Sequence, residues 1–148
     1  MVDVPAEVQI KATLRPGAVY YFPEDTFVSN EPHYFVVINQ NPHSDSVILL
    51  TCISSQIESV TRRRHNCPPE TIVNIATAQY SILTRPSIVD CNNVFEKSVE
   101  QLIAKVGEGK LRIKHEIDTI IVEQLRAGVM RSPLVDRRIK LLLASRGT

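Results

Sequence analysis

The sequence predicts an α+β fold in which a small antiparallel β-barrel is followed by C-terminal helices. Short runs rich in β-branched and aromatic residues, separated by turn formers, occupy residues 13–90. Over residues 93–145 the apolar side chains recur instead at helical spacing. Strands followed by helices is the α+β order, which places the helices on one side or at one end of a sheet. The 148 residues (1–148) are expected to form a single domain.

The composition narrows the class of protein further. A net charge of +1 argues against a bulk polyanion binder but not against a local basic groove. The three cysteines form no C-x-x-C pair, which indicates reduced thiols. The first residues lack the apolar core of a signal peptide, and no apolar run approaches the roughly 18 residues of a membrane span. We therefore expect a soluble cytoplasmic protein with no membrane partner.

The N-terminal part supplies a lead-in and a first strand. Residues 1–12 are expected to be a loosely attached lead-in, although Val8 and Ile10 are candidates for the start of an edge strand. Pro16-Gly17 is a turn signal, and the run A-V-Y-Y-F that follows at 18–22 is rich in β formers. The sequence therefore predicts that the sheet begins directly after this turn.

A β-hairpin is the central element. A loop at 23–32 leads to the aromatic and β-branched run at 34–38, and a second apolar run covers 47–53. Between the two runs lies N-Q-N-P-H-S-D-S, a dense cluster of turn formers. Neither run alternates cleanly between apolar and polar residues, so both strands are predicted to be buried on much of both faces.

Polar residues mark the open end of this hairpin. His33 precedes the first strand, and Ser54, Ser55 and Gln56 follow the second. In an antiparallel pair the start of one strand lies near the end of the other, so His33 is expected close to Ser54 and Ser55. This cluster is a candidate polar site, but it is also what an ordinary strand end looks like.

The remaining strand region is less regular. The polar stretch 58–66, with Cys67-Pro68-Pro69-Glu70, reads as a second exposed loop, and it carries three consecutive arginines. Further strands are expected at 71–75 and 87–89, with a possible short piece at 81–83.

The helical part is expected to begin near residue 93. Asn93 and Glu96 match a loose capping box, and Gly107 and Gly109 are expected to end the helix. Its apolar stripe is Phe95, Val99, Leu102, Ile103 and Val106.

Two more helices are predicted after it. One covers 116–131, and Ser132 with Pro133 should then stop it and start a third helix, because Ser at the cap and Pro at the first position is a standard start. The stripe of the third helix is Leu134, Val135, Ile139, Leu142 and Leu143.

Four segments in this order resemble the PemK/MazF family of toxin ribonucleases from bacterial toxin–antitoxin modules. They are R-P-G-A-V-Y-Y-F at 15–22, H-Y-F-V-V-I at 33–38, I-S-S-Q at 53–56 and S-I-V-D-C-N at 87–92. The G-K-L element at 109–111 also fits, so the resemblance covers roughly residues 13–131.

The resemblance implies an SH3-like (CcdB/PemK-type) barrel that dimerises and cuts single-stranded RNA without a metal or other cofactor. It also implies a cognate antitoxin protein as partner. The family's Arg at the start of the second strand corresponds here to His33, and its Thr at the end of the third corresponds to Ser54. Histidine can act as a general base or acid near neutral pH, but it cannot supply the permanent bidentate charge of arginine. A non-catalytic barrel that binds a protein or nucleic acid therefore stays open, as does a gyrase-poisoning toxin of the same fold.

RNA cleavage through the 2′-hydroxyl needs a base, an acid and donors for the phosphorane charge. We assign His33 as base or acid, and Ser54 and Ser55 as donors. The RNA-binding candidates are Arg62, Arg63, Arg64, His65, Arg85, Tyr20 and Tyr34. The basic run is also consistent with an ordinary solvated loop. No metal site is expected, because the H-x-C spacing of His65 and Cys67 with a distant Cys91 is poor for zinc.

Overall fold

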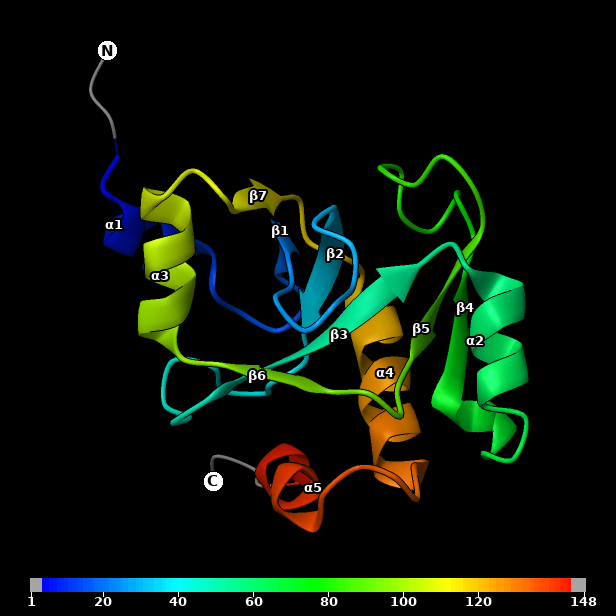
Figure 1. Ribbon diagram of the computed structural model, residues 1–148. Coiled ribbons are helices and arrows are strands. Elements are labelled where there is room, and N and C mark those ends of the chain that lie inside the picture. The colour runs from blue at the N-terminus through cyan, green and yellow to red at the C-terminus, as the bar shows by residue number, and fades with distance from the viewer. Residues whose placement is uncertain (1–3, 145–148) are drawn as a thin grey trace.

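The computed structural model describes residues 4–144, which form one antiparallel sheet surrounded by helices (Figure 1). Over this range the seven strands are β1 (Val19–Pro23), β2 (Pro32–Val37), β3 (Ile48–Ser54), β4 (Ile72–Ile75), β5 (Ser87–Asp90), β6 (Phe95–Lys97) and β7 (Arg112–Lys114). The helices are α1 (Ala6–Thr13), α2 (Ile57–Arg63), α3 (Val99–Gly107), α4 (Thr119–Arg131) and α5 (Arg137–Ala144), with a 3-10 turn η1 (Pro69–Thr71). The predicted α+β class is confirmed.

The long strand β3 bends the sheet. The main order is β4-β5-β3-β2-β1-β7, and β6 pairs with β3 outside this path. On the side of β3 away from β2, its first residues pair with β6 and its last two pair with β5. One strand thus changes partner along its length, which curls the sheet.

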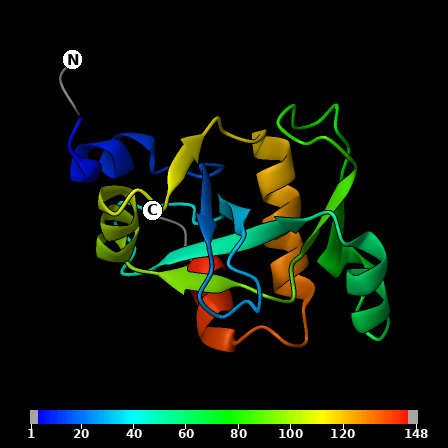
Figure 2. The same cartoon turned by 45° about the horizontal axis from the view of Figure 1, so that its top comes forward.

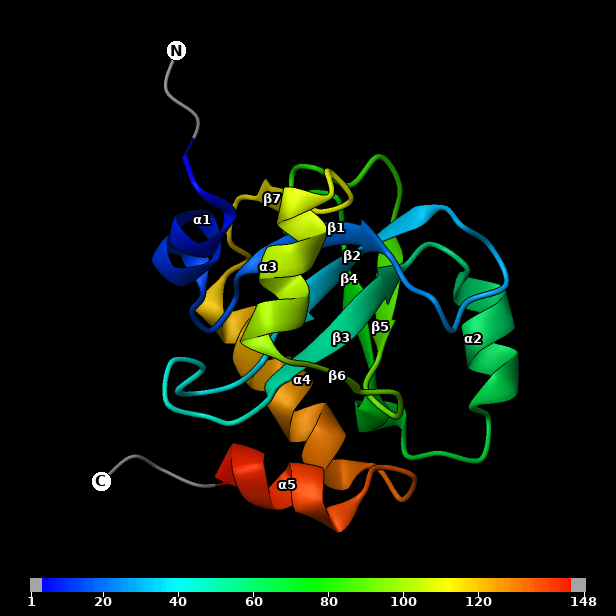
Figure 3. The same ribbon diagram turned by 60° about the vertical axis from the view of Figure 1, so that its left-hand side comes forward.

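The central strands are buried on both faces, as the sequence predicts. Alternate residues of β1, β2 and β3 belong to two apolar clusters on opposite sides of the sheet. One cluster, with Phe22, Phe35 and Leu50, is covered by α1 and α3, and the other, with Val36 and Leu49, is covered by α4 and α5. Figure 3 shows α3 in front of the strands, α1 to their left and α4 behind them. Burial of each such side chain contributes about 1.5–3 kcal/mol.

This arrangement corrects the expectation that the helices cover one side or one end of the sheet. A sheet that is apolar on both faces needs cover on both. Figure 2 shows α5 beside the C-terminal end of α4, and α2 at the end of the molecule opposite α1 and α3.

Residues 6–13 form the helix α1, so the expected lead-in and edge strand are wrong there, and residues 1–3 of that lead-in lie outside the described residues. Ile10 is fully buried while Val8 is half-exposed, because residues two apart lie on nearly opposite sides of a helix. Ile10 and Leu14 pack into the cluster beneath α3. The segment is thus fixed by tertiary contacts, although its own amphipathic pattern is weak.

The predicted turn at Pro16-Gly17 is confirmed. Gly17 has a φ of +89°, and a Cβ there would lie 2.9 Å from the Ile117 carbonyl oxygen. Its N–H donates to the Val37 carbonyl, and its own carbonyl accepts from Ile117 N–H. The glycine therefore lets the chain enter β1 while touching the start of the α4 region.

The basic stretch after β3 is helical rather than an exposed loop. Residues 57–63 form α2, and Val60 is 4% exposed. Val60 lies three residues after Ile57, which is helical spacing, but most of the surrounding residues are polar. The apolar pattern is therefore too short to predict a helix from the sequence. The possible short strand at 81–83 is a turn in the structure.

The expected start of the first C-terminal helix is also wrong. Residues 95–97 form β6, which pairs with β3, and the capping box lies at Ser98 and Gln101 instead. Ser98 Oγ accepts from Gln101 N–H at 3.0 Å, and Gln101 Oε1 accepts from Ser98 N–H at 2.7 Å. The helix ends at Gly107, and Gly109 has a φ of +73°, in agreement with the predicted termination.

At the C-terminal end, α4 agrees with the predicted helix, but Ser132 and Pro133 do not start the next one. Asp136 caps α5, since its Oδ1 accepts from Arg138 N–H at 2.9 Å. Ser132 is fully buried, and Leu134, expected in the apolar stripe, is 55% exposed. None of the helices within residues 4–144 is both long and apolar enough to span a membrane.

Candidate active site

The open end of the β2–β3 hairpin brings His33 and Ser54 together. The ladder pairs Tyr34 with Ile53, so the next two positions, His33 and Ser54, adjoin at its end. Two clefts meet here, and both are lined by His33, Ser54 and Gln56. The strand-end cluster expected from the sequence is therefore the junction of two concave surfaces.

The first of these, the aromatic cleft, has a volume of about 210 Å³. Besides the shared residues, it is lined by Phe27, Cys52 and Phe95 on its apolar side and by Arg63, Asp90 and Asn93 on its polar side. The Phe27 ring contacts the His33 ring edge-on, with centroids 5.0 Å apart, and contacts Phe95 in the same way at 5.5 Å.

The loop that carries Phe27 is fixed by a buried ion pair at its base. Lys97 Nζ lies 2.7 Å from Glu24 Oε1, and Thr26 Oγ donates to Glu24 Oε2 at 2.7 Å. Burial raises the pKa of Glu24, but the hydrogen bonds from Lys97 and Thr26 outweigh it, so its pKa lies below the usual value. The carboxylate therefore stays ionised and anchors the loop over the aromatic cleft.

The second, the Arg85 cleft, has a volume of about 330 Å³. Its lining adds Tyr34, Ser55, Thr84 and Arg85 to the shared residues. Tyr34 packs against Tyr21 with ring centroids 4.4 Å apart. Arg85 is exposed, and within residues 4–144 its side chain makes no hydrogen bond or ion pair. It thus offers an unpaired cation beside Ser55.

The two central side chains have unused hydrogen-bonding capacity. His33 is half-buried, and among the described residues its buried Nδ1 atom has no partner. Ser54 Oγ accepts from Gln56 N–H at 3.0 Å, which leaves the hydroxyl proton for donation. A buried polar atom without a partner costs free energy, so within residues 4–144 the imidazole is held with one of its two nitrogens unsatisfied.

Several predicted RNA-binding residues lie elsewhere. Tyr20 is fully buried, and its hydroxyl is 2.9 Å from Thr13 Oγ, so its ring cannot stack on a base. This corrects its assignment. Arg62 and His65 lie outside both clefts, and His65 Nδ1 contacts the Arg62 carbonyl at 3.0 Å. Successive helical residues point about 100° apart, so the basic run does not act as one surface.

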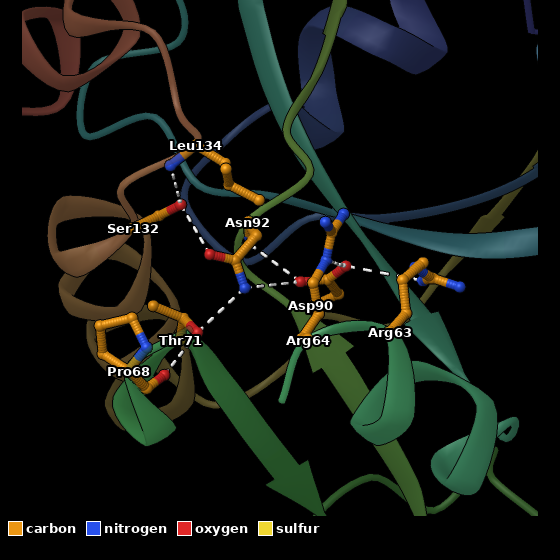
Figure 4. Close-up of polar contacts among 8 residues, drawn as sticks. All are labelled: Arg63, Arg64, Pro68, Thr71, Asp90, Asn92, Ser132 and Leu134. Carbon is orange, nitrogen blue, oxygen red and sulfur yellow. Dashed lines mark hydrogen bonds and ion pairs between the residues drawn. The ribbon is translucent and has the colours of Figure 1, made fainter. Parts of the chain in front are cut away.

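The sequence reasoning missed Asp90, which lines the aromatic cleft at the end of β5. The β3–β5 ladder pairs Ile53 with Val89, so Asp90 follows opposite Cys52. Its Oδ2 accepts from Arg64 Nε at 2.9 Å and lies 3.6 Å from Arg63 Nη2 (Figure 4). A carboxylate ending an apolar strand was the one available signal.

The cysteines do not form an activated nucleophile. Burial raises the pKa of Cys52 to about 12, with a smaller contribution from Glu24, and raises that of Cys91 to about 12, with a smaller contribution from Asp90. Both are protonated at neutral pH, whereas a nucleophilic cysteine needs a lowered pKa. Within residues 4–144, no three His, Cys, Asp or Glu side chains are grouped so as to hold a metal ion.

Comparisons with known proteins give a distant structural neighbour. No family model matches the chain, and no curated protein matches its sequence. Among solved structures, the Mycobacterium tuberculosis toxin MazF-mt6 is similar with a TM-score of 0.46 and 12% identity. The match covers 78% of this chain and 93% of the toxin. This likeness is too distant to bear on the chemistry of the clefts.

Proposed function

We propose that this chain is a metal-independent endoribonuclease toxin that cuts single-stranded RNA with some sequence preference. The observation that carries the proposal is the junction at His33 and Ser54, where two clefts meet and each provides an arginine, Arg63 or Arg85. A strand that crosses the junction would place a phosphate beside the imidazole and the hydroxyl. The resemblance of four sequence segments to PemK/MazF ribonucleases supports this proposal.

In the proposed reaction the 2′-oxygen attacks the adjacent phosphorus while the bond to the 5′-oxygen breaks. The products are a 2′,3′-cyclic phosphate and a 5′-hydroxyl. His33 acts either as base for the 2′-hydroxyl or as acid for the leaving oxygen, which contributes typically 10²–10⁴-fold. Ser54 and Ser55 donate to the phosphorane oxygens, and Arg63 and Arg85 hold the flanking phosphates.

We also propose a homodimer that is neutralised by a cognate antitoxin seated in the aromatic cleft. This cleft lies between the loop that carries Phe27 and helix α2, which contributes Val60 and Arg63. A segment bound there would cover His33 and block RNA. An acidic residue in that segment would pair with Arg63.

The second candidate is a non-catalytic barrel that binds a nucleic acid or a protein partner. The observation in its favour is His33 itself, which stands where the resemblance implies an arginine and packs edge-on against Phe27. A half-buried imidazole holds a phosphate less strongly than a guanidinium does.

The deciding experiment incubates the protein with a long single-stranded RNA in EDTA. His33→Ala and Ser54→Ala are the test variants. His43→Ala and Ser46→Ala are matched controls, because both side chains are exposed outside the two clefts. We expect discrete cuts by wild type and by both controls, and loss of the cuts in both test variants. Cuts that persist in both test variants would move the site, and folded wild-type protein that cuts no RNA would support the binding module.

A further inference from the structure

We propose that Asp90 is a positioning residue that orients the arginines of α2 at the aromatic cleft, and that a buried hydrogen-bond chain reaching the end of α4 fixes it there. The inference rests on the proposed RNA substrate only for the identity of the ligand. The contacts that carry it lie within the protein (Figure 4).

Both oxygens of the Asp90 carboxylate are occupied, although the residue is only 9% exposed. Oδ1 accepts from the backbone N–H and the side-chain Nδ2 of Asn92, both at 3.0 Å. Oδ2 accepts from Arg64 Nε at 2.9 Å. A buried charge persists only when it is paired and hydrogen-bonded in this way, so the carboxylate has one orientation.

Asn92 is fixed in turn by two buried hydroxyls from distant parts of the chain. Its Nδ2 donates to Thr71 Oγ at 2.9 Å, and its Oδ1 accepts from Ser132 Oγ at 2.6 Å. Asn92 is 6% exposed, and Thr71 and Ser132 are fully buried. The chain of hydrogen bonds therefore connects η1, the end of β5 and the end of α4 without relying on solvent.

Arg63 and Arg64 differ in their exposure and in how closely they contact Asp90. Arg64 is 19% exposed and bound directly to Asp90, so it anchors the C-terminal end of α2. Arg63 is 52% exposed, lines the aromatic cleft and has its Nη2 atom 3.6 Å from Asp90 Oδ2. Two guanidinium groups against one carboxylate leave a net positive charge at the cleft. The 3.6 Å contact with Asp90 favours positions of the Arg63 guanidinium beside the cleft, where a phosphate can meet it.

A simpler interpretation treats Asp90 as a screening charge that weakens binding of a polyanion. The two interpretations predict opposite signs for Asp90→Asn. Removal of a negative charge near the cleft should tighten RNA binding if Asp90 only screens. If Asp90 positions the two arginines, RNA binding should weaken. An asparagine at this position would turn its amide N–H toward Arg64 Nε, so two donors would face each other. Both arginines would then lose the contact that holds them.

The test measures the affinity for a 2′-O-methyl RNA oligonucleotide by fluorescence anisotropy over a series of salt concentrations. This probe lacks the 2′-hydroxyl nucleophile, so binding is measured apart from cleavage. The variants are Asp90→Asn, Arg63→Ala and Arg64→Lys, which keeps the charge but loses the guanidinium fork. Glu96→Gln is the matched control, because it removes a carboxylate that pairs with Arg138 outside both clefts.

We expect Asp90→Asn and Arg64→Lys to bind roughly tenfold more weakly than wild type, with Glu96→Gln unchanged or slightly tighter. The slope of log affinity against log salt should fall in magnitude by about 0.7 for each phosphate that the protein no longer neutralises. Asp90→Asn that binds as tightly as wild type or more tightly, with an unchanged slope, would overturn the proposal.

Failure of this inference and failure of the proposed function are distinguishable. If wild type binds the probe but cuts no RNA, the proposed catalytic function is wrong, and the binding data of the variants still decide whether Asp90 positions the arginines. Wild type that cuts RNA while Asp90→Asn binds and cuts equally removes the positioning role alone. Folded wild type that binds no RNA removes both. If Asp90→Asn melts before assay, Arg64→Lys and Ser132→Ala carry the same test, because Ser132→Ala removes the donor to Asn92.

Discussion

The aromatic cleft and the Arg85 cleft share His33 and Ser54 but present their arginines in different ways. Arg63 lies 3.6 Å from a buried carboxylate that is itself fixed on both oxygens. Arg85 is exposed and, in the part of the chain that the structure describes, has no charged partner. One cleft therefore holds an oriented, partly neutralised charge, and the other holds an exposed, fully available one.

The side chains that line the two clefts also differ in polarity. The aromatic cleft has an apolar side made by Phe27, Cys52 and Phe95, whereas the Arg85 cleft adds hydroxyls from Ser55 and Thr84. Packing should dominate affinity in the first cleft and charge in the second. A single strand end can thus serve two binding surfaces of different physical character.

Among the residues that both clefts share, His33 should be the most sensitive to substitution, because it is the one assigned to transfer a proton. His33→Ala should lower the single-turnover cleavage rate by about 10²–10⁴-fold, because the group that transfers the proton is lost. Affinity for uncleavable RNA should change by no more than about threefold, since the arginines remain. Parallel losses of rate and affinity would show instead that His33 only holds the RNA.

A comparison of Ser54 with Ser55 tests whether the reacting phosphate lies at the junction of the two clefts or within the Arg85 cleft. Ser54 lines both clefts and Ser55 only the Arg85 cleft, so Ser54→Ala should cost more cleavage rate than Ser55→Ala. A loss of about 10–100-fold is expected for Ser54→Ala if its hydroxyl donates to the phosphorane. Single-turnover rates at saturating protein check the order, and a larger effect at Ser55 would shift the reacting phosphate into the Arg85 cleft.

The two arginines test the contrast between an oriented and an exposed charge. Arg63→Ala and Arg85→Ala should each weaken RNA binding severalfold at low salt. The loss at Arg85 should shrink more between about 50 and 200 mM salt, because the Arg85 charge is unpaired among the described residues, whereas Asp90 already offsets part of the Arg63 charge. Anisotropy titrations at both salt concentrations give the answer, and equal salt responses would mean that the two arginines are equivalent.

A weaker effect concerns the thiols rather than the activity. Cys52 and Cys91 have their pKa raised to about 12, so their alkylation at pH 8 should be slow and should rise about tenfold per pH unit up to pH ~11. Mass spectrometry after iodoacetamide treatment measures each site. Uncleavable RNA should slow the reaction at Cys52, which lines the aromatic cleft, but not at Cys67, which does not. Equal protection of both would indicate a global effect.

The same pKa shift fixes the sign of alkaline stability. Cys91 is fully buried, and its pKa lies above the value of about 8.5 expected for the unfolded chain. The folded state therefore favours the protonated thiol, and stability is complete below pH ~8.5 and declines as pH rises toward 12. Chemical denaturation at pH 8 and pH 10 should show a lower free energy of unfolding at the higher pH, and the Cys91→Ala variant should show a smaller decline.

Much of the sheet follows from the sequence, whereas most of the cleft chemistry does not. The unalternating apolar runs on either side of 39–46 predict a hairpin buried on both faces, and its register places His33 beside Ser54. By contrast, β6 reads as the start of a helix, because Phe95 fits the helical stripe of α3. Pairing with β3 overrides that local pattern.

Local sequence is sufficient to specify the class of fold, the turn at Gly17, the central hairpin and the meeting of His33 with Ser54. These features depend on local propensity and on one ladder, so nearby residues are enough to encode them. Tertiary packing was needed to show that Asp90 meets Arg64, that Tyr20 is buried and that Arg63 alone of its basic run lines a cleft. Those outcomes depend on how α2, β5 and α4 pack together. Residues that are distant in sequence, or that point about 100° apart on a helix, form no local sequence pattern from which this packing could be predicted.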